Sequence, residues 1–215
     1  MDIKELNKVK EKNLKLLANK RIMVCSGTGC TSSKSDVLLA NLKKAIKISG
    51  VKNLSVEKTG CFGFCAKGPI VVIDPDEIFY EMVKPEDALD IVNSIIEGKI
   101  IDRLLAEEKE QLVKKWHELN FYNKQERIAL KNCGKINPEK IEEYIALDGY
   151  QALYKALNMS RDEVINEINL SGLRGRGGAG FPTGRKWQFT KEAESDIKYV
   201  CCNADEGDPG AFMDR

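Results

Sequence analysis

Two pairs of cysteines constrain the fold of this chain more than any other feature of its sequence. Cys25 and Cys30 are separated by four residues, Cys61 and Cys65 by three, and 30 residues lie between the two pairs. Each pair follows a segment that is typical of a β-strand, and several glycines stand close to both pairs. We therefore expect two neighbouring loops, each following a strand, to bring four thiols together.

Four thiols in this pattern could hold an iron–sulfur cluster, hold a zinc ion, or be buried as structural cysteines. A [2Fe–2S] cluster needs two thiolates for each iron, and nearby glycines allow backbone N–H groups to point at the sulfur atoms. Zinc sites mostly use cysteine pairs with two intervening residues, a spacing that neither pair has. The spacing therefore favours a [2Fe–2S] cluster, with zinc and buried structural cysteines as the alternatives.

The segments around the cysteines predict a small α/β domain over residues 20–105, preceded by an N-terminal helix over residues 1–19. The order strand, helix, strand, cysteine loop, strand, strand, helix fits a thioredoxin-like sandwich. The helix between the first two strands implies parallel pairing, and the tight turn between the last two implies antiparallel pairing. The expected strands are residues 21–25, 53–60, 69–74 and 78–83, and the expected helices are residues 32–50 and 84–99.

The character of the sequence changes beyond this domain. Residues 106–130 are strongly charged, and we expect them to form a helical linker. In the last of three helices expected after it, Ser160 is the N-cap, Glu163 completes a capping box and Gly172 marks the end. A buried strand is expected over residues 197–204. The three expected helices are residues 138–147, 149–158 and 160–172.

Residues 172–187, GLRGRGGAGFPTGRKW, combine six glycines with four basic residues and bulky aromatic side chains. The dinucleotide-binding fingerprint requires a strand before its glycines, where we expect a helix, and the P-loop pattern does not match this stretch. Bare backbone N–H groups can still form an anion-binding concavity, and a helix that begins near Pro182 would favour a phosphate at its N-terminus. A flexible linker is the alternative, although linkers are usually mixtures of Gly and Ser.

An acidic loop follows the last expected strand. Asn203 stands at the strand end, and Asp205, Glu206 and Asp208 come directly after it. In open α/β sheets, ligands bind at the carboxyl ends of strands, where such side chains can accept hydrogen bonds from ribityl or ribose hydroxyls. A solvated acidic turn is the alternative interpretation.

With these motifs, residues 21–105 resemble the thioredoxin-like [2Fe–2S] ferredoxin domain. That domain occurs as the small NADH-side subunit of respiratory complex I, and it is fused to the front of related flavoproteins in NAD-linked hydrogenases. The stretches CSGTGC and CFGFC carry the resemblance. It implies that the cluster ligands are Cys25, Cys30, Cys61 and Cys65.

Residues 132–215 resemble the flavoprotein subunit that binds FMN and NADH in complex I and in related hydrogenases and formate dehydrogenases. The resemblance implies that residues 131–215 are the N-terminal part of a Rossmann-like α/β domain, with a [4Fe–4S] cluster in family segments that lie beyond Arg215. It implies that Phe181 and Phe189 stack on NADH and that Asp208 accepts a hydrogen bond from the nicotinamide side. The implied FMN-binding residues are Gly175, Arg176, Gly177, Gly178, Ala179, Gly180, Lys186, Asn203, Asp205 and Glu206.

The same resemblance implies an oxidoreductase that exchanges hydride between NADH or NADPH and FMN and then passes single electrons to iron–sulfur clusters. The cofactors carry this chemistry, so we predict no catalytic side chain. Because the ferredoxin domain is fused to the flavoprotein, we expect a subunit of an NAD(P)-linked hydrogenase, with the other subunits of that complex as partners. The alternatives are a cluster-carrying electron-transfer or docking subunit without a working flavin, and a zinc-stapled interaction module.

The composition limits where the chain acts. Its 215 residues carry a net charge of +1, which provides no global field to attract nucleic acid. No apolar run approaches the roughly 18–20 residues that a membrane span needs. We expect the charged N-terminus not to be a secretory signal, and seven cysteines then indicate a reducing compartment, the cytoplasm. We expect Cys133, Cys201 and Cys202 to be small buried hydrophobic side chains.

Overall fold

The computed structural model of the chain describes residues 2–176 and 179–203. The described residues form two compact units, residues 2–147 and residues 148–203, and each is described here by itself. Their boundary lies after residue 147, whereas the sequence led us to expect a linker at residues 106–130.

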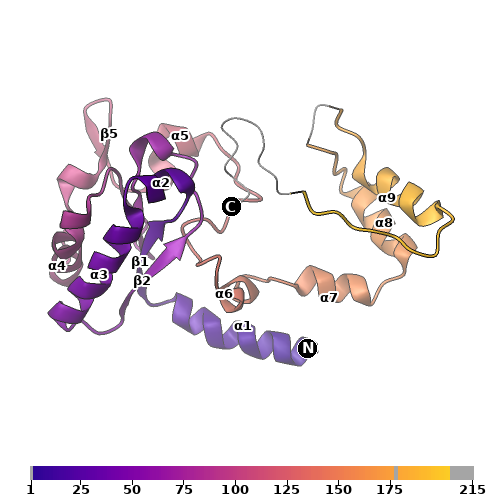
Figure 1. The fold of residues 1–215 in the computed structure, drawn as a ribbon, viewed down its shortest axis with the longest axis horizontal. Helices are drawn as coiled ribbons and strands as arrows, with labels where there is room; N and C mark the ends of the chain where they lie inside the picture. Colours follow the sequence, from indigo (N-terminus) through magenta and orange to yellow (C-terminus); the bar gives the residue numbers. More distant parts are fainter. Residues whose placement is uncertain (1, 177–178, 204–215) are drawn as a thin grey trace. The chain divides into compact units, whose positions relative to one another are not determined.

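A four-stranded sheet forms the centre of the first unit (Figure 1). The predicted parallel and antiparallel pairs are confirmed, because the first two strands run parallel and the last two antiparallel. The first strand also pairs antiparallel with the third, so that the spatial order is β2-β1-β3-β4. The strands are β1 (Lys20–Cys25), β2 (Leu54–Thr59), β3 (Val71–Asp74) and β4 (Ile78–Tyr80).

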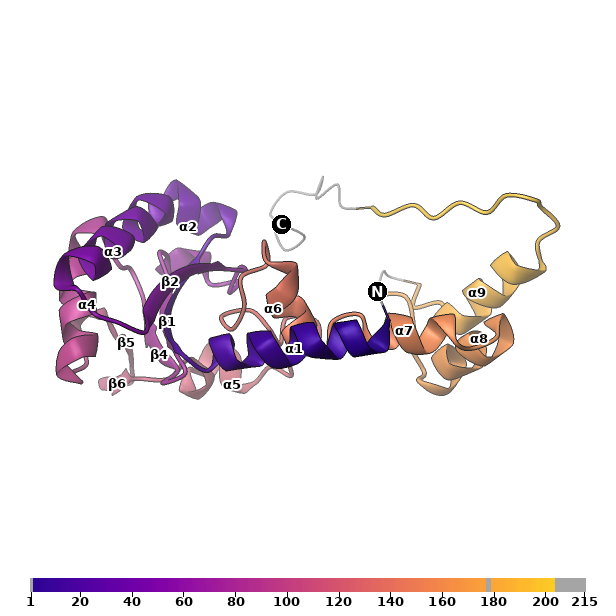
Figure 2. The same cartoon turned by 90° about the horizontal axis from the view of Figure 1, so that it is seen from below.

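Two helices, α3 (Ser35–Ser49) and α4 (Ala88–Glu97), lie side by side on one face of this sheet (Figure 1). Each ends at a glycine with a left-handed φ, Gly50 at +65° and Gly98 at +67°, as their sequences predicted. The N-terminal helix α1 (Ile3–Leu17) packs against α6 (Ile141–Ala146) (Figure 2). These helices confirm four predicted segments, residues 1–19, 32–50, 84–99 and 138–147, and add a contact between the two ends of the unit.

The sheet separates two hydrophobic cores, because alternate residues of a strand face opposite sides. Ile22 and Val24 of β1 join the core beneath α3 and α4. Met23 and Cys25 belong to the core on the other side, together with Tyr122. The first cysteine of the motif is therefore part of a buried apolar cluster.

Residues 106–130 do not form the helical linker that their charge led us to predict. They contain a hairpin of β5 (Ala106–Glu108) and β6 (Gln111–Val113) and the short helix α5 (Asn120–Asn123). Lys109 and Glu110 both have a positive φ, as in a two-residue hairpin turn. Leu119 and Tyr122 are buried in the second core, so packing against the sheet overrides local helix propensity.

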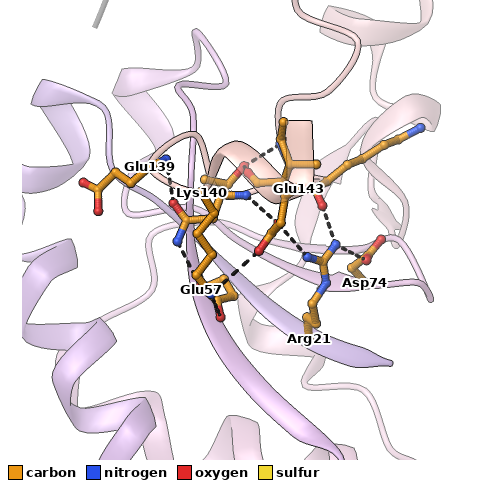
Figure 3. A network of polar contacts seen from close by, with 11 residues as sticks. Arg21, Glu57, Asp74, Glu139, Lys140 and Glu143 are labelled. Carbon is orange, nitrogen blue, oxygen red and sulfur yellow. Dashed lines mark hydrogen bonds and ion pairs between the residues drawn. The ribbon is translucent and has the colours of Figure 1, made fainter. Parts of the chain in front are cut away.

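A polar network attaches the segment after the hairpin to the edge of the sheet (Figure 3). Arg21 of β1 is 4 % exposed, and its guanidinium lies 2.9 Å from the Asp74 carboxylate and 3.1 Å from that of Glu143. It also donates to the carbonyl of Lys135, and the backbone N–H of Asn137 donates to Glu143 over 2.9 Å. The network therefore joins residues 135–143 to strands β1 and β3.

A second set of contacts reaches strand β2 in the same network (Figure 3). The Lys140 ammonium lies 2.6 Å from the Glu57 carboxylate, which also accepts a 2.9 Å hydrogen bond from the Asn137 amide. Lys58 pairs with Glu139 over 3.0 Å. Residues 131–147 thus pack as part of the first unit, although the sequence led us to assign them to the second domain.

The described part of the second unit contains three helices, and all three were expected from the sequence. The Ser160 side chain accepts from the backbone N–H of Glu163, whose carboxylate accepts from that of Ser160, so the predicted capping box is present. Gly184 lies where a helix-to-helix contact is tight, because a Cβ atom there would collide with the side chain of Asn169. The helices are α7 (Gln151–Leu157), α8 (Arg161–Leu170) and α9 (Thr183–Glu192).

The strand predicted over residues 197–204 is not formed in the part that the structure describes. Residues 197–203 belong to no helix or strand and are exposed, with Val200 97 % exposed. A strand is stable only where another strand pairs with it, and no described residue of the second unit is in one. The expected burial of Cys201 and Cys202 is therefore also wrong, whereas Cys133 is half-buried.

Candidate iron–sulfur site and glycine loop

The fold brings the four motif cysteines together. Cys25 is the last residue of β1 and Cys61 follows β2, so the parallel pairing of these strands puts both at one edge of the sheet. The thiol of Cys25 interacts with those of Cys30 and Cys61, and Cys61 interacts with Cys65. Cys30 lies in a short helix, α2 (Thr28–Ser32), rather than in the loop that we expected.

Exposure distinguishes one cysteine from the other three. Cys25, Cys30 and Cys61 are buried, while Cys65 is exposed. Cys65 opens the 3-10 turn η1 (Cys65–Lys67), which lies at the surface of the unit. A group held by all four thiols would therefore be enclosed on three sides and reachable from solvent on the side of Cys65.

The mutual proximity of the thiols shifts their pKa values apart. Contact with Cys30 is the largest cause that raises the pKa of Cys25 to about 11, and the same contact lowers the pKa of Cys30. Contact with Cys25, followed by burial, raises the pKa of Cys61, and burial is the main cause that raises the pKa of Cys65. Thiolates so close together repel one another, so all four can ionise only with a compensating cation.

Three glycines leave room for the sulfur atoms. A Cβ atom at Gly68 would lie 2.7 Å from Cys30 Sγ, and one at Gly27 would lie 2.9 Å from Cys61 Sγ. A Cβ atom at Gly29 would lie 3.0 Å from Cys65 Sγ. In addition, the backbone N–H of Gly63 lies 3.3 Å from Cys61 Sγ, in the position of an N–H donor to a cluster ligand. The backbone around these thiols therefore has the shape and donors that an iron–sulfur cluster needs.

The arrangement of the four thiols bears on which metal they fit. In the part of the chain that the structure describes, no group of three or more His, Cys, Asp or Glu side chains is placed to hold a metal ion. The thiols do interact with one another: Cys25 with Cys30 and Cys61, and Cys65 with Cys61 and Cys30. Four thiols provide two ligands for each iron of a two-iron cluster, which is the pattern that their spacing in the sequence favours.

Two aromatic residues from outside the motif, Phe121 and Tyr122, pack on the cysteine loop, and sequence reasoning did not assign them to the site. Phe62 is 4 % exposed, and the Tyr122 hydroxyl donates a 3.1 Å hydrogen bond to its carbonyl. Phe64 stacks on Phe121 with ring centres 4.8 Å apart. We call residues 114–134 the cover segment. The only sequence signal for it was the concentration of Trp, Phe and Tyr within a charged stretch.

The cover segment reaches the backbone beside the second cysteine pair. A Cβ atom at Gly60 would come within 3.2 Å of Cys133 Sγ, and one at Gly134 would lie 2.7 Å from the Phe62 ring. The backbone N–H of Gly134 donates a 2.8 Å hydrogen bond to the buried hydroxyl of Thr59. The cover segment is therefore held within contact distance of the loop that carries Cys61.

In the second unit, the glycine loop of residues 172–187 is closed at its base. The backbone N–H of Gly175 donates to the carbonyl of Phe181 over 2.8 Å, and that of Thr183 donates to Leu173 over 3.0 Å. Arg174 Nε also donates to the Gly180 carbonyl over 2.8 Å. Helix α9 then begins with no side chain capping its N-terminus, so no side-chain cap satisfies its first backbone N–H groups.

Several of the predicted flavin and nucleotide residues come together in this unit. A cavity of about 790 Å³ is lined by Gly175, Phe181 and Lys186, together with Trp187 and residues of α8. The ring of Phe189 lies 6.3 Å from that of Phe181. The remaining predicted residues divide into two groups: Arg176, Ala179, Gly180 and Asn203 lie outside the lining of this cavity, and Gly177, Gly178, Asp205, Glu206 and Asp208 lie outside the described residues.

None of the helices in the described residues combines the length and the apolar character that crossing a membrane requires.

Comparison with known proteins shows where this chain has relatives. It is 60 % identical over 92 residues to the NADP-reducing hydrogenase subunit HndC of Solidesulfovibrio fructosivorans, a match that covers 43 % of this chain and 19 % of that protein. It is 54 % identical over 88 residues to an NADH-quinone oxidoreductase subunit of Aquifex aeolicus, covering 41 % and 20 %. The chain thus spans about a fifth of the length of these curated relatives.

Among solved structures, the thioredoxin-like [2Fe-2S] ferredoxin from Aquifex aeolicus matches with 27 % identity and a TM-score of 0.38, covering 42 % of this chain and 98 % of that one. Two family models also match, in separate parts of the sequence. The model of the thioredoxin-like [2Fe-2S] ferredoxin family matches residues 11–96, and that of the Nuo51 FMN-binding domain matches residues 168–215.

Proposed function

We propose that the first unit is an electron-transfer domain in which Cys25, Cys30, Cys61 and Cys65 hold a [2Fe–2S] cluster. The observation that carries this proposal is the group of four interacting thiols with three glycines against their sulfur atoms, at positions where a side chain would collide with sulfur. The family match of residues 11–96 supports it. Among the four ligands, Cys65 is the exposed one, and electrons would enter or leave on its side.

The residues of the chain bind and shield the cluster. The thiolates hold the iron, and the Gly63 N–H donates to the Cys61 sulfur. Phe62 and the cover segment exclude water from the buried side, which lowers the local dielectric around the charge that the site must carry. When bound, the cluster would accept or donate one electron at a time.

We propose that the second unit contributes to an FMN and NAD(P)H site. The closed glycine loop and the start of α9 would hold the FMN phosphate, with Lys186 as its cationic partner. Phe181 and Phe189 are exposed aromatic rings that could stack on the nucleotide. Arg176, Gly177, Gly178, Ala179, Gly180, Asn203, Asp205, Glu206 and Asp208 keep the binding roles that the sequence predicts.

The oxidoreductase to which these sites point would exchange hydride between NADH or NADPH and FMN and pass single electrons to iron–sulfur clusters. We propose that it is an NAD(P)-linked hydrogenase acting in the cytoplasm, with the other subunits of that complex as partners. The similarity to HndC supports this choice, and the similarity to the NADH-quinone oxidoreductase of Aquifex aeolicus keeps a quinone-linked complex as the second candidate.

Cysteine variants test the cluster proposal. We expect Cys61→Ala to lose most of its bound iron and the visible absorption of the cluster, because an alanine cannot ligate iron. The matched control is Cys133→Ala, which removes a half-buried thiol close to the same loop and is expected to retain iron and absorption. Equal iron contents in Cys61→Ala and the unaltered chain would contradict the ligand assignment.

Flavin titration tests the second proposal. FMN fluorescence is expected to be quenched on addition of the chain, and Lys186→Gln is expected to weaken FMN binding about tenfold, because it removes a charge-assisted hydrogen bond. Lys155→Gln in α7 is the control, since Lys155 pairs with Glu167 on the surface and does not line the cavity. Unchanged FMN affinity in Lys186→Gln would remove Lys186 from the site.

A further inference from the structure

The cover segment places a cationic side chain, Arg127, among the aromatic rings beside the cysteine loop. Its Cζ atom lies 5.0 Å from the centre of the Trp116 ring, 5.7 Å from that of Tyr122 and 5.9 Å from that of Phe62. Its guanidinium also donates a 3.0 Å hydrogen bond to the Leu130 carbonyl. Four partners therefore fix the position of this half-buried charge.

Two contacts place Arg127 next to the loop that carries Cys61. Phe62 directly follows Cys61, and its ring is one of the three beneath the guanidinium. Arg127 also interacts with the thiol of Cys133, and that thiol lies against the backbone of Gly60. Both contacts therefore lead to a sequence neighbour of Cys61, a proposed cluster ligand: one contact leads to Phe62, and the other leads through Cys133 to Gly60.

The pKa of Tyr122 is affected both by Arg127 and by three of the motif cysteines. Burial is the main cause that raises the pKa of Tyr122, and Arg127 opposes this shift. Cys25, Cys61 and Cys30 act in the opposite direction, because their negative charge disfavours the phenolate. A single buried hydroxyl therefore lies within electrostatic range of the guanidinium and of three proposed ligands.

Among the described residues, no acidic side chain neutralises the charge of Arg127. Within the described part of the chain, no carboxylate forms an ion pair with it. The other arginines of the first unit differ, since Arg21 pairs with Asp74 and Glu143, and Arg103 pairs with Asp87 and Asp90. An uncompensated, half-buried cation is screened less than a surface one, so its field extends to the cysteine loop.

We propose that the positive charge of Arg127 raises the reduction potential of the cluster held by the four cysteines. This inference rests on the proposed function of the first unit. Reduction adds an electron to a group that four thiolates already make negative, and a fixed positive charge stabilises the reduced state more than the oxidised state. The aromatic rings hold the guanidinium in place beside the cysteine loop.

The test is an anaerobic redox titration of the full chain, followed by low-temperature EPR. We expect Arg127→Gln to shift the midpoint potential of the cluster to a lower value and Arg127→Lys to retain most of the potential of the unaltered chain. Lys124→Gln is the matched control, because it removes one positive charge from an exposed position three residues away. Equal midpoint potentials in Arg127→Gln and Lys124→Gln would overturn the proposal.

A second variant keeps the test decisive if Arg127→Gln loses its cluster. Arg127→His carries a charge that pH can switch. We expect its midpoint potential to rise, relative to that of the unaltered chain, as the pH falls through the imidazole pKa. The other titratable or charged groups around this position are Tyr122, Cys133, His117, Lys131 and Lys135, and all are present in both proteins. Parallel curves of potential against pH would overturn the proposal.

The iron content of the unaltered chain separates failure of this inference from failure of the proposed function. If the unaltered chain binds no iron and sulfide, the cluster assignment itself is wrong. If it binds a cluster and the potential does not respond to the charge at position 127, the cluster assignment stands and the role of Arg127 is wrong.

Discussion

The two units differ in how much of their candidate site is built by their own residues. In the first unit, the sheet and the cover segment pack around the motif cysteines, and three of the four are buried. In the second, Phe181, Trp187 and Phe189 are 43 %, 45 % and 51 % exposed, and among the described residues Ile165 is the one apolar side chain that is buried there. The comparison teaches that a sequence motif forms an enclosed site only where other residues of the same unit pack around it.

The largest expected effect comes from adding a side-chain atom beside a motif cysteine in the first unit. Gly68→Ala would place a Cβ atom 2.7 Å from Cys30 Sγ, so we expect this variant to lose most of its bound iron. The control is Gly50→Ala, where the added Cβ atom meets open space and a left-handed φ costs about 1 kcal/mol of stability. Iron analysis by mass spectrometry distinguishes them, and a Gly68→Ala protein with its full iron content would contradict the enclosed site.

The next effect tests the polar network that joins residues 135–143 to the sheet. Arg21→Met leaves the buried carboxylate of Glu143 and the half-buried carboxylate of Asp74 without the guanidinium, and we expect the free energy of unfolding of the first unit to fall by about 3 kcal/mol. Urea denaturation followed by circular dichroism measures this change.

The neighbouring surface pair supplies the control for the network. Lys20 lies 2.7 Å from Asp76, but both side chains are 39 % exposed, so Lys20→Met is expected to cost about 0.5 kcal/mol or less. If the two substitutions destabilise the unit equally, the network of Figure 3 does not hold the segment to the sheet.

The smallest effect compares the same capping motif in both units. Ser160→Ala removes the N-cap of α8, and Asp2→Ala removes that of α1; each is expected to cost its own helix about 1 kcal/mol. Hydrogen exchange should show faster exchange only in the helix whose cap is removed. Faster exchange in α8 after Asp2→Ala would show that the two units are not independent.

Local sequence signals predicted the elements that depend on neighbouring residues. The strands β1 to β3 and the helices α3, α4 and α8 lie where periodicity and caps place them, and the glycines Gly50 and Gly98 stop their helices as expected. The four cysteines were also recognisable, because their spacing and the strands before them are local features.

The errors concern contacts between residues that are distant in the sequence. The turn at Lys109 and Glu110 lacks the Asn or Gly that usually marks a two-residue hairpin, so the charged stretch was interpreted as a helix. The pairing of Arg21 with Glu143 spans 122 residues and has no local signature. The position of Arg127 over three aromatic rings could not be predicted either, because it also has no local signature in the sequence.

Strand prediction failed in the second unit for a related reason. Residues 197–203 have the apolar, β-branched character of a buried strand, but a strand also requires a hydrogen-bonding neighbour, which periodicity does not reveal. Their exposure in the described residues makes the second site the less complete of the two.

The measurement that tests the central claim most directly is metal and sulfide analysis of the anaerobically purified chain, with low-temperature EPR after reduction by dithionite. We predict about two irons and two sulfides per chain and a rhombic signal from a single unpaired spin, as expected for a reduced [2Fe–2S] cluster. One zinc per chain with no EPR signal would contradict the account, and the four cysteines would then form a structural zinc site.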